Sequence, residues 1–158
     1  MTRVYLSLGS NLEPEKNLRA AIDELREKFG EIVVSPTYRF PSVGFEGPPF
    51  LNLAVAIDTN LDAAALNDRL HDLEDRHGRR RDVPRFSSRT LDVDIVLFGD
   101  AVMTGPGNLQ IPRDELKHAF VLQPLADIAS DVVHPIAKRT IGALLRDSPE
   151  TRGDRVDL

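Results

Sequence analysis

The sequence of 158 residues predicts an α+β sandwich with a mainly antiparallel sheet, in the split β-α-β order of ferredoxin-like folds. Segments with period-two alternation and segments with apolar residues three and four apart follow one another in the order β-α-β-β-α-β. The two consecutive strands in the middle imply antiparallel neighbours. We expect the sheet to form one layer of the sandwich. Most helices would pack together on one face of that sheet.

The first part of the chain predicts a strand, a helix and a second strand. Residues 3–8 alternate in polarity and end in the turn composition Gly9-Ser10-Asn11. Pro14 suits the first turn of a helix, and Gly30 suits its end. The β-branched segment Glu31–Tyr38 predicts the second strand.

The middle of the chain contains a loop, a strand and a second helix. Phe40–Pro49 has three prolines and two glycines, and a loop of this length is expected to be functional or mobile. Phe50–Thr59 alternates and predicts a strand. Apolar residues at helical spacing run from Leu66 to His77, and Gly78 closes this helix.

An apolar strand, Leu91–Phe98, opens the last part of the chain. A Gly-Pro-Gly turn at 105–107 and shorter elements follow it, which we expect at 109–111, 121–129 and 141–146. The last ten residues are polar, and we expect them to be frayed. The predicted organisation is one domain over residues 1–147 and a polar tail over 148–158.

Composition excludes several classes of protein. The formal net charge of −5 argues against a protein that coats nucleic acid, so we expect no nucleic-acid partner. The absence of cysteine excludes disulfides, a thiol nucleophile and a cysteine-based zinc site. The apolar run near the N-terminus is too short for a signal peptide, and no segment approaches a membrane span. We therefore expect a cytoplasmic protein with no membrane partner.

Two aspartates and a group of arginines are the most informative residues. Asp92 and Asp94 lie on one face of a strand, roughly 6.5–7 Å apart. Six arginines between Arg76 and Arg89 are accompanied by one acid, Asp82. Carboxylates hold Mg²⁺, and arginines neutralise phosphate oxygens. This adjacency predicts a phosphoryl-transfer site.

Each feature also has a purely structural explanation. Two aspartates on one strand face are also typical of the solvent-exposed face of an antiparallel sheet, and a run of arginines is typical of a solvated surface. Two like charges on one strand face are stabilised by a neighbouring opposite charge. The aspartates and the arginines together therefore favour the interpretation as a phosphate site. Neither a P-loop motif nor a nucleophile motif is present, so metal and arginines would have to carry phosphate chemistry.

An ordered set of motifs resembles the family of 6-hydroxymethyl-7,8-dihydropterin pyrophosphokinases of the folate pathway. The set covers nearly the whole chain and consists of Leu8-Gly9-Ser10-Asn11-Leu12, Tyr38-Arg39, Phe50-Leu51-Asn52, Arg85-Phe86, Arg89-Thr90-Leu91-Asp92-Val93-Asp94-Ile95, Pro112 and Phe120. The resemblance implies transfer of pyrophosphate from ATP to the hydroxymethyl group of the pterin, with release of AMP.

The resemblance also implies roles for individual residues. Two Mg²⁺ ions would bind to Asp92 and Asp94. The residues implied in catalysis are Arg79, Arg89, Asp92 and Asp94. The residues implied in ATP binding are His71, Glu74, Arg81, Arg85, Arg89, Ile95, Arg113 and His118.

The reduced pterin would be held by a second group of residues. These are Pro41, Val43, Phe50, Asn52, Phe86, Asp92 and Phe120. A flat heterocycle rich in donors and acceptors suits two aromatic faces and a side-chain amide. For the two phenylalanines the alternative is core packing, and for Asn52 it is a hydrogen bond at a sheet edge.

Departures from the family pattern keep other functions open. Phe40 stands where the family has a small threonine beside the pterin, and Phe86 where it has a tryptophan. Arg113 and His118 replace a phosphate-contacting histidine and an arginine. The alternatives are a divergent paralogue that binds Mg-ATP with a different or modified pterin-like acceptor, and a non-catalytic binding module. The family implies a monomer or weak dimer.

Overall fold

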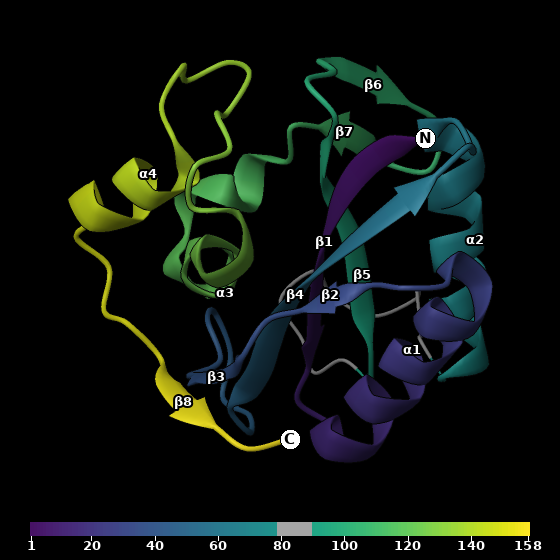
Figure 1. The fold of residues 1–158 in the computed structure, drawn as a ribbon. Helices are drawn as coiled ribbons and strands as arrows, with labels where there is room; N and C mark the ends of the chain where they lie inside the picture. Colours follow the sequence, from purple (N-terminus) through teal and green to yellow (C-terminus); the bar gives the residue numbers. More distant parts are fainter. Residues whose placement is uncertain (79–89) are drawn as a thin grey trace.

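The computed structural model describes residues 1–78 and 90–158 (Figure 1). Its elements in chain order are β1 (Thr2–Ser10), α1 (Pro14–Phe29), β2 (Val33–Val34), β3 (Thr37–Phe40), β4 (Phe50–Thr59), α2 (Ala63–Arg76), β5 (Asp92–Phe98), β6 (Met103–Gly105), β7 (Leu109–Ile111), the 3₁₀ helix η1 (Asp114–Lys117), α3 (Ala119–Ala129), α4 (Ile141–Asp147) and β8 (Asp154–Val156). No helix in these described ranges is long and apolar enough to span a membrane.

The main sheet has the order β5-β1-β4-β3-β8, and β2 also pairs with β4. Every pairing in it is antiparallel. β1 therefore lies between β4 and β5, and β4 separates it from β3, as the split β-α-β order requires. The predicted fold class is confirmed.

Helices cover both faces of this sheet, so the expectation of helices on one face is wrong (Figure 1). One core joins α1 and α2 to alternate residues of the central strands, such as Leu6 and Leu53. A second core joins α3 and α4 to residues of the opposite face, such as Tyr5 and Ala54. The central strands are apolar on both faces, and each face must be covered.

The first two helices begin and end where local chemistry predicts. Pro14 is at the start of α1, and Gly30 ends it with a positive φ of 77°. This conformation favours glycine because it has no Cβ. The carboxylate of Asp62 caps α2 by accepting a hydrogen bond from the backbone N–H of Ala65 at 2.8 Å.

Two strand predictions are wrong in their bounds. The turn expected at Gly9-Ser10 is the last part of β1, which continues to Ser10. The single strand expected over residues 31–38 is divided into β2 and β3 at Ser35-Pro36. Proline lacks a backbone N–H, and the Ser35 hydroxyl instead accepts a hydrogen bond from the N–H of Ala54 at 2.8 Å.

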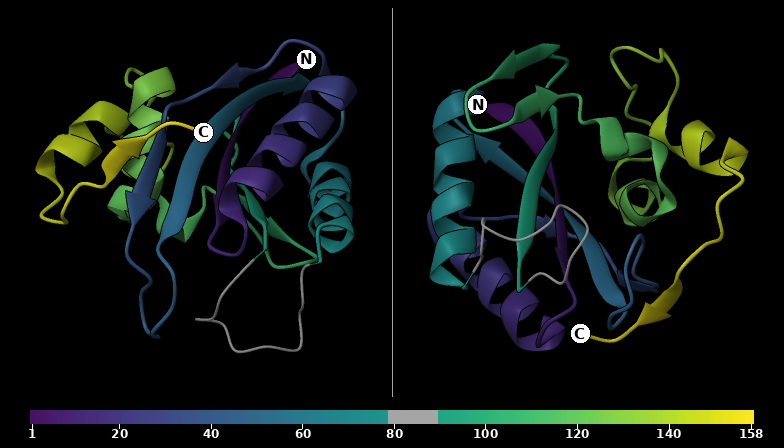
Figure 2. Two further views of the ribbon diagram at one scale, coloured as in Figure 1. Left: turned by 90° about the horizontal axis from the view of Figure 1, so that it is seen from below. Right: turned by 180° about the vertical axis from the view of Figure 1, so that it is seen from behind.

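The end of the chain is ordered, so the expectation of a frayed terminus is wrong. β8 pairs with β3 and becomes the outermost strand of the sheet on that side (Figure 1). Asp154 and Arg155 are exposed, whereas Val156 packs against the core, so backbone pairing and one apolar contact hold β8 in place. Figure 2 shows the loop of residues 41–49 projecting at the end of the sheet where β4 and β5 begin.

Candidate active site

Three neighbouring strands place polar residues in one row across the sheet. Gly9 of β1 lies opposite Asn52 of β4 on one side and opposite Asp92 of β5 on the other. Side chains of directly paired residues point to the same face. Asn52 and Asp92 therefore share the face that α3 covers further along, although they are 40 positions apart in the sequence. They lie two strand spacings, about 10 Å, apart.

The second row carries the other aspartate. Ser7 lies opposite Ala54 and Asp94, so Asp92 and Asp94 project from one face of β5. Both aspartates are half-buried, and the side chain of Asp94 keeps 36% of its exposure. The two carboxylates are therefore accessible from solvent and separated by roughly 6.5–7 Å along the strand.

These carboxylates suit Mg²⁺. Within residues 1–78 and 90–158, no group of three or more His, Cys, Asp or Glu side chains forms a closed metal cage. Mg²⁺ in phosphoryl-transfer sites is held by one or two carboxylates and completes its octahedron with phosphate oxygens and water. Asp92 and Asp94 supply that donor set, and their partial exposure leaves room for the substrate ligands.

Gly9 allows the row to be closely packed. A Cβ at this position would lie 2.7 Å from Nδ2 of Asn52 and 3.8 Å from Cδ1 of Phe50. Asn52 is only 6% exposed, and its Oδ1 atom is buried without a hydrogen-bond partner among residues 1–78 and 90–158. A buried carbonyl oxygen without a donor is unfavourable. The site thus presents an amide oxygen that a donor-bearing ligand can satisfy.

Glu74 of α2 holds β5 from the side away from β1. Its side chain is 3% exposed, and Oε2 accepts a hydrogen bond from the backbone N–H of Val93 at 2.9 Å. β5 is the edge strand of the main sheet, so its outward N–H groups need partners other than a strand. Because Val93 lies between Asp92 and Asp94, this bond fixes the strand that carries both carboxylates.

Arg113 brings a positive charge to the aspartates. Its Nη2 lies 3.6 Å from Oδ1 of Asp94, and its Nε lies 3.0 Å from Oε2 of Glu115. The backbone N–H of Arg113 donates to the carbonyl of Val96 at 3.0 Å, which ties this segment to β5. The structure thus brings Arg113, a predicted phosphate contact, beside Asp94.

Aromatic residues line the β3 side of this face. Phe40 lies opposite Phe50, and Phe40 and Tyr38 form a small cluster with Ala119 and Phe120 at the start of α3. Phe50 is half-buried, whereas Phe40 is 8% exposed. Phe40 packs into this cluster, so its bulk is accommodated between β3 and α3.

A hydrogen bond joins β3 to α3 below the aromatic cluster. The hydroxyl of Tyr38 donates to Oδ2 of Asp127 at 2.5 Å. Burial of the ring, together with this hydrogen bond, raises the pKa of Tyr38 to about 12. Tyr38 lies opposite Asn52, so the bond fixes the next residue in the polar row.

The loop that follows β3 is tied to the end of β1. Nδ2 of Asn11 donates to the carbonyl of Pro48 at 3.1 Å, and the Ser42 hydroxyl donates to the same carbonyl at 2.6 Å. Pro41 and Val43 are exposed in this loop, with 65% exposure for Val43. The side chains of both residues, which are predicted pterin contacts, are therefore accessible to solvent.

Three other residues predicted to bind ATP have contacts within the fold. Ile95 is 2% exposed and packs in the core beneath α1 and α2, so only its backbone remains available for ATP. His71 of α2 lies beside the turn at Gly107, where a Cβ would be 3.3 Å from its ring. Nδ1 of His118 lies 2.8 Å from Oε2 of Glu150. The tertiary fold rather than sequence spacing decides these contacts.

The remaining predicted residues lie outside the described ranges. They are Arg79, Arg81, Arg85, Phe86 and Arg89.

The sequence did not point to several residues that shape this region. The position of Gly9 could have indicated its role, because a glycine inside an alternating strand often marks the close approach of another group. Asp127 was a polar residue in an apolar helix, which is a weak signal for a buried hydrogen bond. Glu115 and Glu150 had no signal, because their partners are defined only by the fold.

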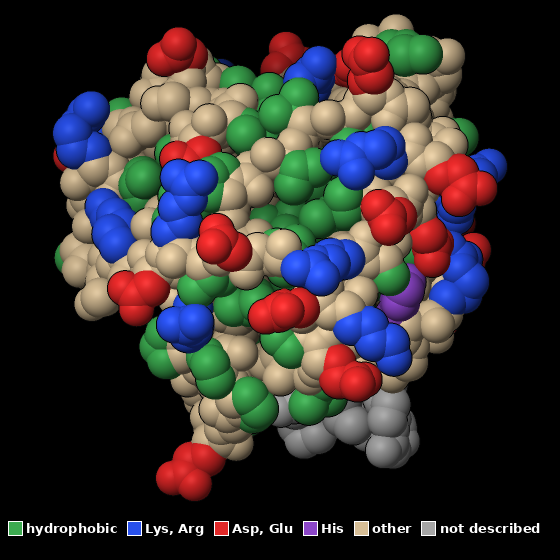
Figure 3. Space-filling model, turned by 60° about the horizontal axis from the view of Figure 1, so that its bottom comes forward, with side chains coloured by type: hydrophobic (Ala, Val, Ile, Leu, Met, Phe, Trp, Pro, Cys, Tyr) green, Lys and Arg blue, Asp and Glu red, His purple; other side chains and the backbone are tan. Residues whose placement is uncertain are grey.

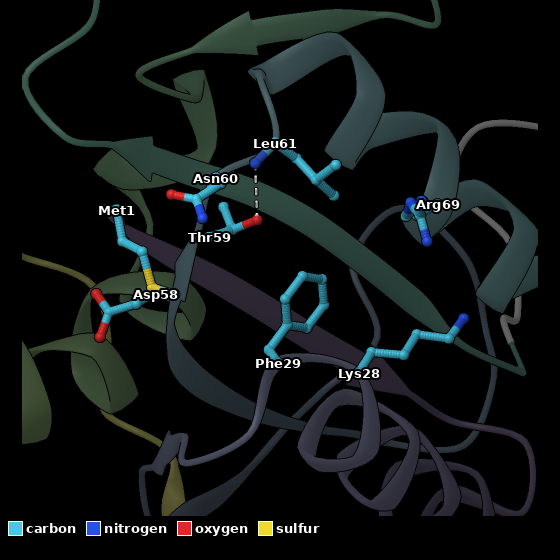
Figure 4. A pocket seen from close by; sticks show the side chains of 8 residues that line it. All are labelled: Met1, Lys28, Phe29, Asp58, Thr59, Asn60, Leu61 and Arg69. Atoms are coloured by element: carbon cyan, nitrogen blue, oxygen red, sulfur yellow. Dashed lines mark hydrogen bonds between the residues drawn. The ribbon is translucent and has the colours of Figure 1, made fainter.

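A hollow at the opposite end of the sheet contains none of the predicted residues (Figure 4). Its volume is about 280 Å³, and its lining is Met1, Lys28, Phe29, Asp58, Thr59, Asn60, Leu61 and Arg69.

Figure 3 shows acidic and basic side chains interspersed over the face in view, with no continuous basic surface there.

Comparison with solved structures supports the fold. The chain matches the crystal structure of wild-type HPPK-DHPS from Plasmodium falciparum with a TM-score of 0.70 and 15% identity. The match covers 92% of this chain and 43% of that one, so the chain spans less than half the length of this structural neighbour.

Curated relatives are closer in sequence. A 2-amino-4-hydroxy-6-hydroxymethyldihydropteridine pyrophosphokinase of Pseudomonas aeruginosa is 43% identical over 139 residues, covering 84% of this chain and 84% of that protein. A protein of the same name from Bacillus subtilis is 37% identical over 133 residues, covering 81% and 78%. The model of one protein family matches residues 5–130. The chain belongs to the 7,8-dihydro-6-hydroxymethylpterin-pyrophosphokinase (HPPK) family.

Proposed function

We propose that this protein transfers pyrophosphate from ATP to the hydroxymethyl group of 6-hydroxymethyl-7,8-dihydropterin and releases AMP, as a step of folate biosynthesis. One observation carries the proposal. The row Asn52–Gly9–Asp92 places a buried, unsatisfied amide oxygen on the same face as the two aspartates. The names of the curated relatives support the same reaction.

The pterin binds on the Asn52 side of the row. Its ring N–H groups can donate to Oδ1 of Asn52, an acceptor that is buried and has no partner in the described part of the chain. Phe50 and Phe120 are the aromatic faces for the ring, one from β4 and one from the start of α3. The hydroxymethyl group would then point along the row toward Asp92.

The triphosphate of ATP binds on the β5 side. Asp92 and Asp94 would hold Mg²⁺, which supplies charge neutralisation to the phosphates when it is bound. Arg113 lies within reach of Asp94 and adds a positive charge beside it. Glu74 keeps the backbone between the two aspartates in place through Val93.

Catalysis follows from positioning and charge rather than from a covalent protein step. The hydroxymethyl oxygen attacks the β-phosphorus of ATP and loses its proton to water. The bond between the β-phosphorus and the α-phosphate bridging oxygen breaks, and AMP leaves with that oxygen. Asn52 and the aromatic residues fix the acceptor, while the β5 carboxylates and Arg113 fix and neutralise the donor.

Growth of a bacterium that lacks its own pterin pyrophosphokinase tests this role. Expression of the wild-type protein is expected to remove the requirement for added end products of folate metabolism, and Asp94→Asn is expected to fail. Immunoblots of both proteins control for expression. Abundant wild-type protein in cells that still depend on the supplement would contradict the proposal and favour a different acceptor.

A further inference from the structure

The C-terminal segment crosses the site region after α4. β8 pairs with β3, with Tyr38 opposite Arg155 and Arg39 opposite Asp154 (Figure 1). Just before β8, the N–H of Gly153 donates to Oε1 of Gln123 at 2.7 Å, and Nε2 of Gln123 donates to the Gly153 carbonyl at 3.3 Å. The segment therefore joins β3 to α3, the two elements that carry the aromatic cluster.

Glu150 is the residue of this segment that reaches the start of α3. Its Oε1 accepts a hydrogen bond from the backbone N–H of Ala119, and its Oε2 lies near Nδ1 of His118, each at 2.8 Å. The residue at the N-cap position, His118, provides no side-chain cap of its own. The first N–H groups of a helix have no partner within it, so Glu150 takes the role of a capping side chain from a distant part of the chain.

Electrostatics agree with this geometry. The hydrogen bond from the Ala119 N–H, followed by the one with His118, lowers the pKa of the Glu150 carboxyl. The carboxylate is therefore stabilised in its charged form at the positive end of α3.

Phe120 is held through these two contacts. The ring of His118 stacks on the ring of Phe120, with centroids 5.3 Å apart and an angle of 15° between planes. Phe120 also packs against the cluster of Tyr38, Phe40 and Ala119. Since Glu150 binds both residues that precede Phe120, it limits the rotation of the first turn and of the ring that stacks on Phe120.

Gly153 adds a steric link between the segment and this cluster. A Cβ at this position would lie 2.7 Å from the Arg39 carbonyl oxygen and 2.7 Å from the Phe40 ring. The segment therefore lies in close contact with Phe40, and a glycine is needed for it. The aromatic cluster is enclosed by β3, α3 and the C-terminal segment.

We propose that Glu150 is a positioning residue for the pterin site, which acts through His118 and Ala119 to hold Phe120 against the pterin ring. The inference rests on the proposed function, because that function places Phe120 on the pterin. A role in fold stability alone would affect both substrates equally; a positioning role affects the pterin selectively.

Steady-state kinetics of Glu150→Ala, Glu150→Gln and the control Asp157→Asn separate these roles. Asp157 is an exposed acid of the same segment. Glu150→Ala is expected to raise the KM for the pterin about fivefold, the effect of losing one capping hydrogen bond, with the KM for Mg-ATP unchanged. Glu150→Gln retains an oxygen for the Ala119 N–H and is expected to restore most of the affinity. Unchanged KM values, or equal increases for both substrates, would overturn the proposal.

Hydrogen exchange separates failure of this inference from failure of the proposed function. Wild-type protein that forms no AMP from the pterin would contradict the proposed function. In that case the amides of Ala119 and Phe120 still report on positioning: they are expected to exchange about fivefold faster in Glu150→Ala and at the wild-type rate in Asp157→Asn. Unchanged exchange in Glu150→Ala would overturn the positioning role.

Discussion

Asn52 and Asp92 lie in one row across the sheet, each directly opposite Gly9 on the strand between them. The amide on one side and the carboxylate on the other are therefore held by backbone pairing, which is rigid. The proposed acceptor site and the proposed phosphate site meet at a residue without a side chain. The missing side chain leaves room for the Asn52 amide, because a Cβ on Gly9 would lie 2.7 Å from its Nδ2.

Gly9→Ala is expected to weaken pterin binding about tenfold, the size of losing one or two hydrogen bonds to a buried group. The added Cβ would lie 2.7 Å from Nδ2 of Asn52 and would displace that amide. Calorimetric titration of the pterin measures the change. The control is the double variant with Asn52→Ala, which should bind no worse than Asn52→Ala alone. Additive losses would show that Gly9 acts independently of Asn52.

Asp94→Asn is expected to lower kcat about 10²–10³-fold, because a neutral amide is a poor ligand for Mg²⁺ and stabilises less charge in the transition state. Initial rates over a Mg²⁺ titration measure the effect. Asp58→Asn is the matched control, since Asp58 pairs with Arg3 at the other end of the sheet. A rate for Asp94→Asn within twofold of wild type would place the metal elsewhere.

Glu74→Ala is expected to reduce the free energy of unfolding by about 1–3 kcal/mol, because the N–H of Val93 loses its acceptor in a buried place. Urea denaturation measures the loss. Glu74→Gln retains an oxygen at that position and is expected to be closer to wild type. If the two variants were equally unstable, the charge of Glu74 rather than its hydrogen bond to Val93 would account for the effect.

Tyr38→Phe is expected to change how stability depends on alkaline pH. The pKa of Tyr38 is raised from 10.0 to about 12, chiefly by burial, so its hydroxyl stabilises the folded state fully below pH 10. That contribution is lost as the pH rises from 10 through 12, because the unfolded state ionises first. The stability difference between wild type and Tyr38→Phe, measured by urea denaturation from pH 8 to pH 11, should be constant and then shrink. A constant difference up to pH 11 would contradict the assignment.

Local signals predicted much of the fold. The bounds of α1 follow from Pro14 and Gly30, and β4 spans the predicted residues Phe50–Thr59. β8 could not be predicted, because a three-residue edge strand with one partly buried apolar residue has no apolar pattern. The second helical layer was missed because the alternation of the central strands was interpreted as one buried face, whereas Tyr5 and Ala54 show that the other is buried too.

The candidate site was predictable where its residues share strands. Asp92 and Asp94 follow from period two, and Asn52 joins them because β1 pairs with both neighbouring strands. The contacts of Arg113 with Asp94 and of Glu150 with His118 were not predictable. Each depends on the placement of a segment that has no periodic pattern, so only the tertiary structure brings the charges together.

Phosphorus NMR of the products tests the proposed reaction most directly. Wild-type protein is incubated with Mg-ATP and 6-hydroxymethyl-7,8-dihydropterin, with Asp94→Asn and a sample without pterin as controls. We expect AMP and a pterin diphosphate ester in equal amounts, seen as a single phosphate resonance and two coupled ones, only in the wild-type sample with pterin. ADP with a pterin monophosphate, or no pterin-dependent product from a protein that binds Mg-ATP, would contradict pyrophosphate transfer to this acceptor.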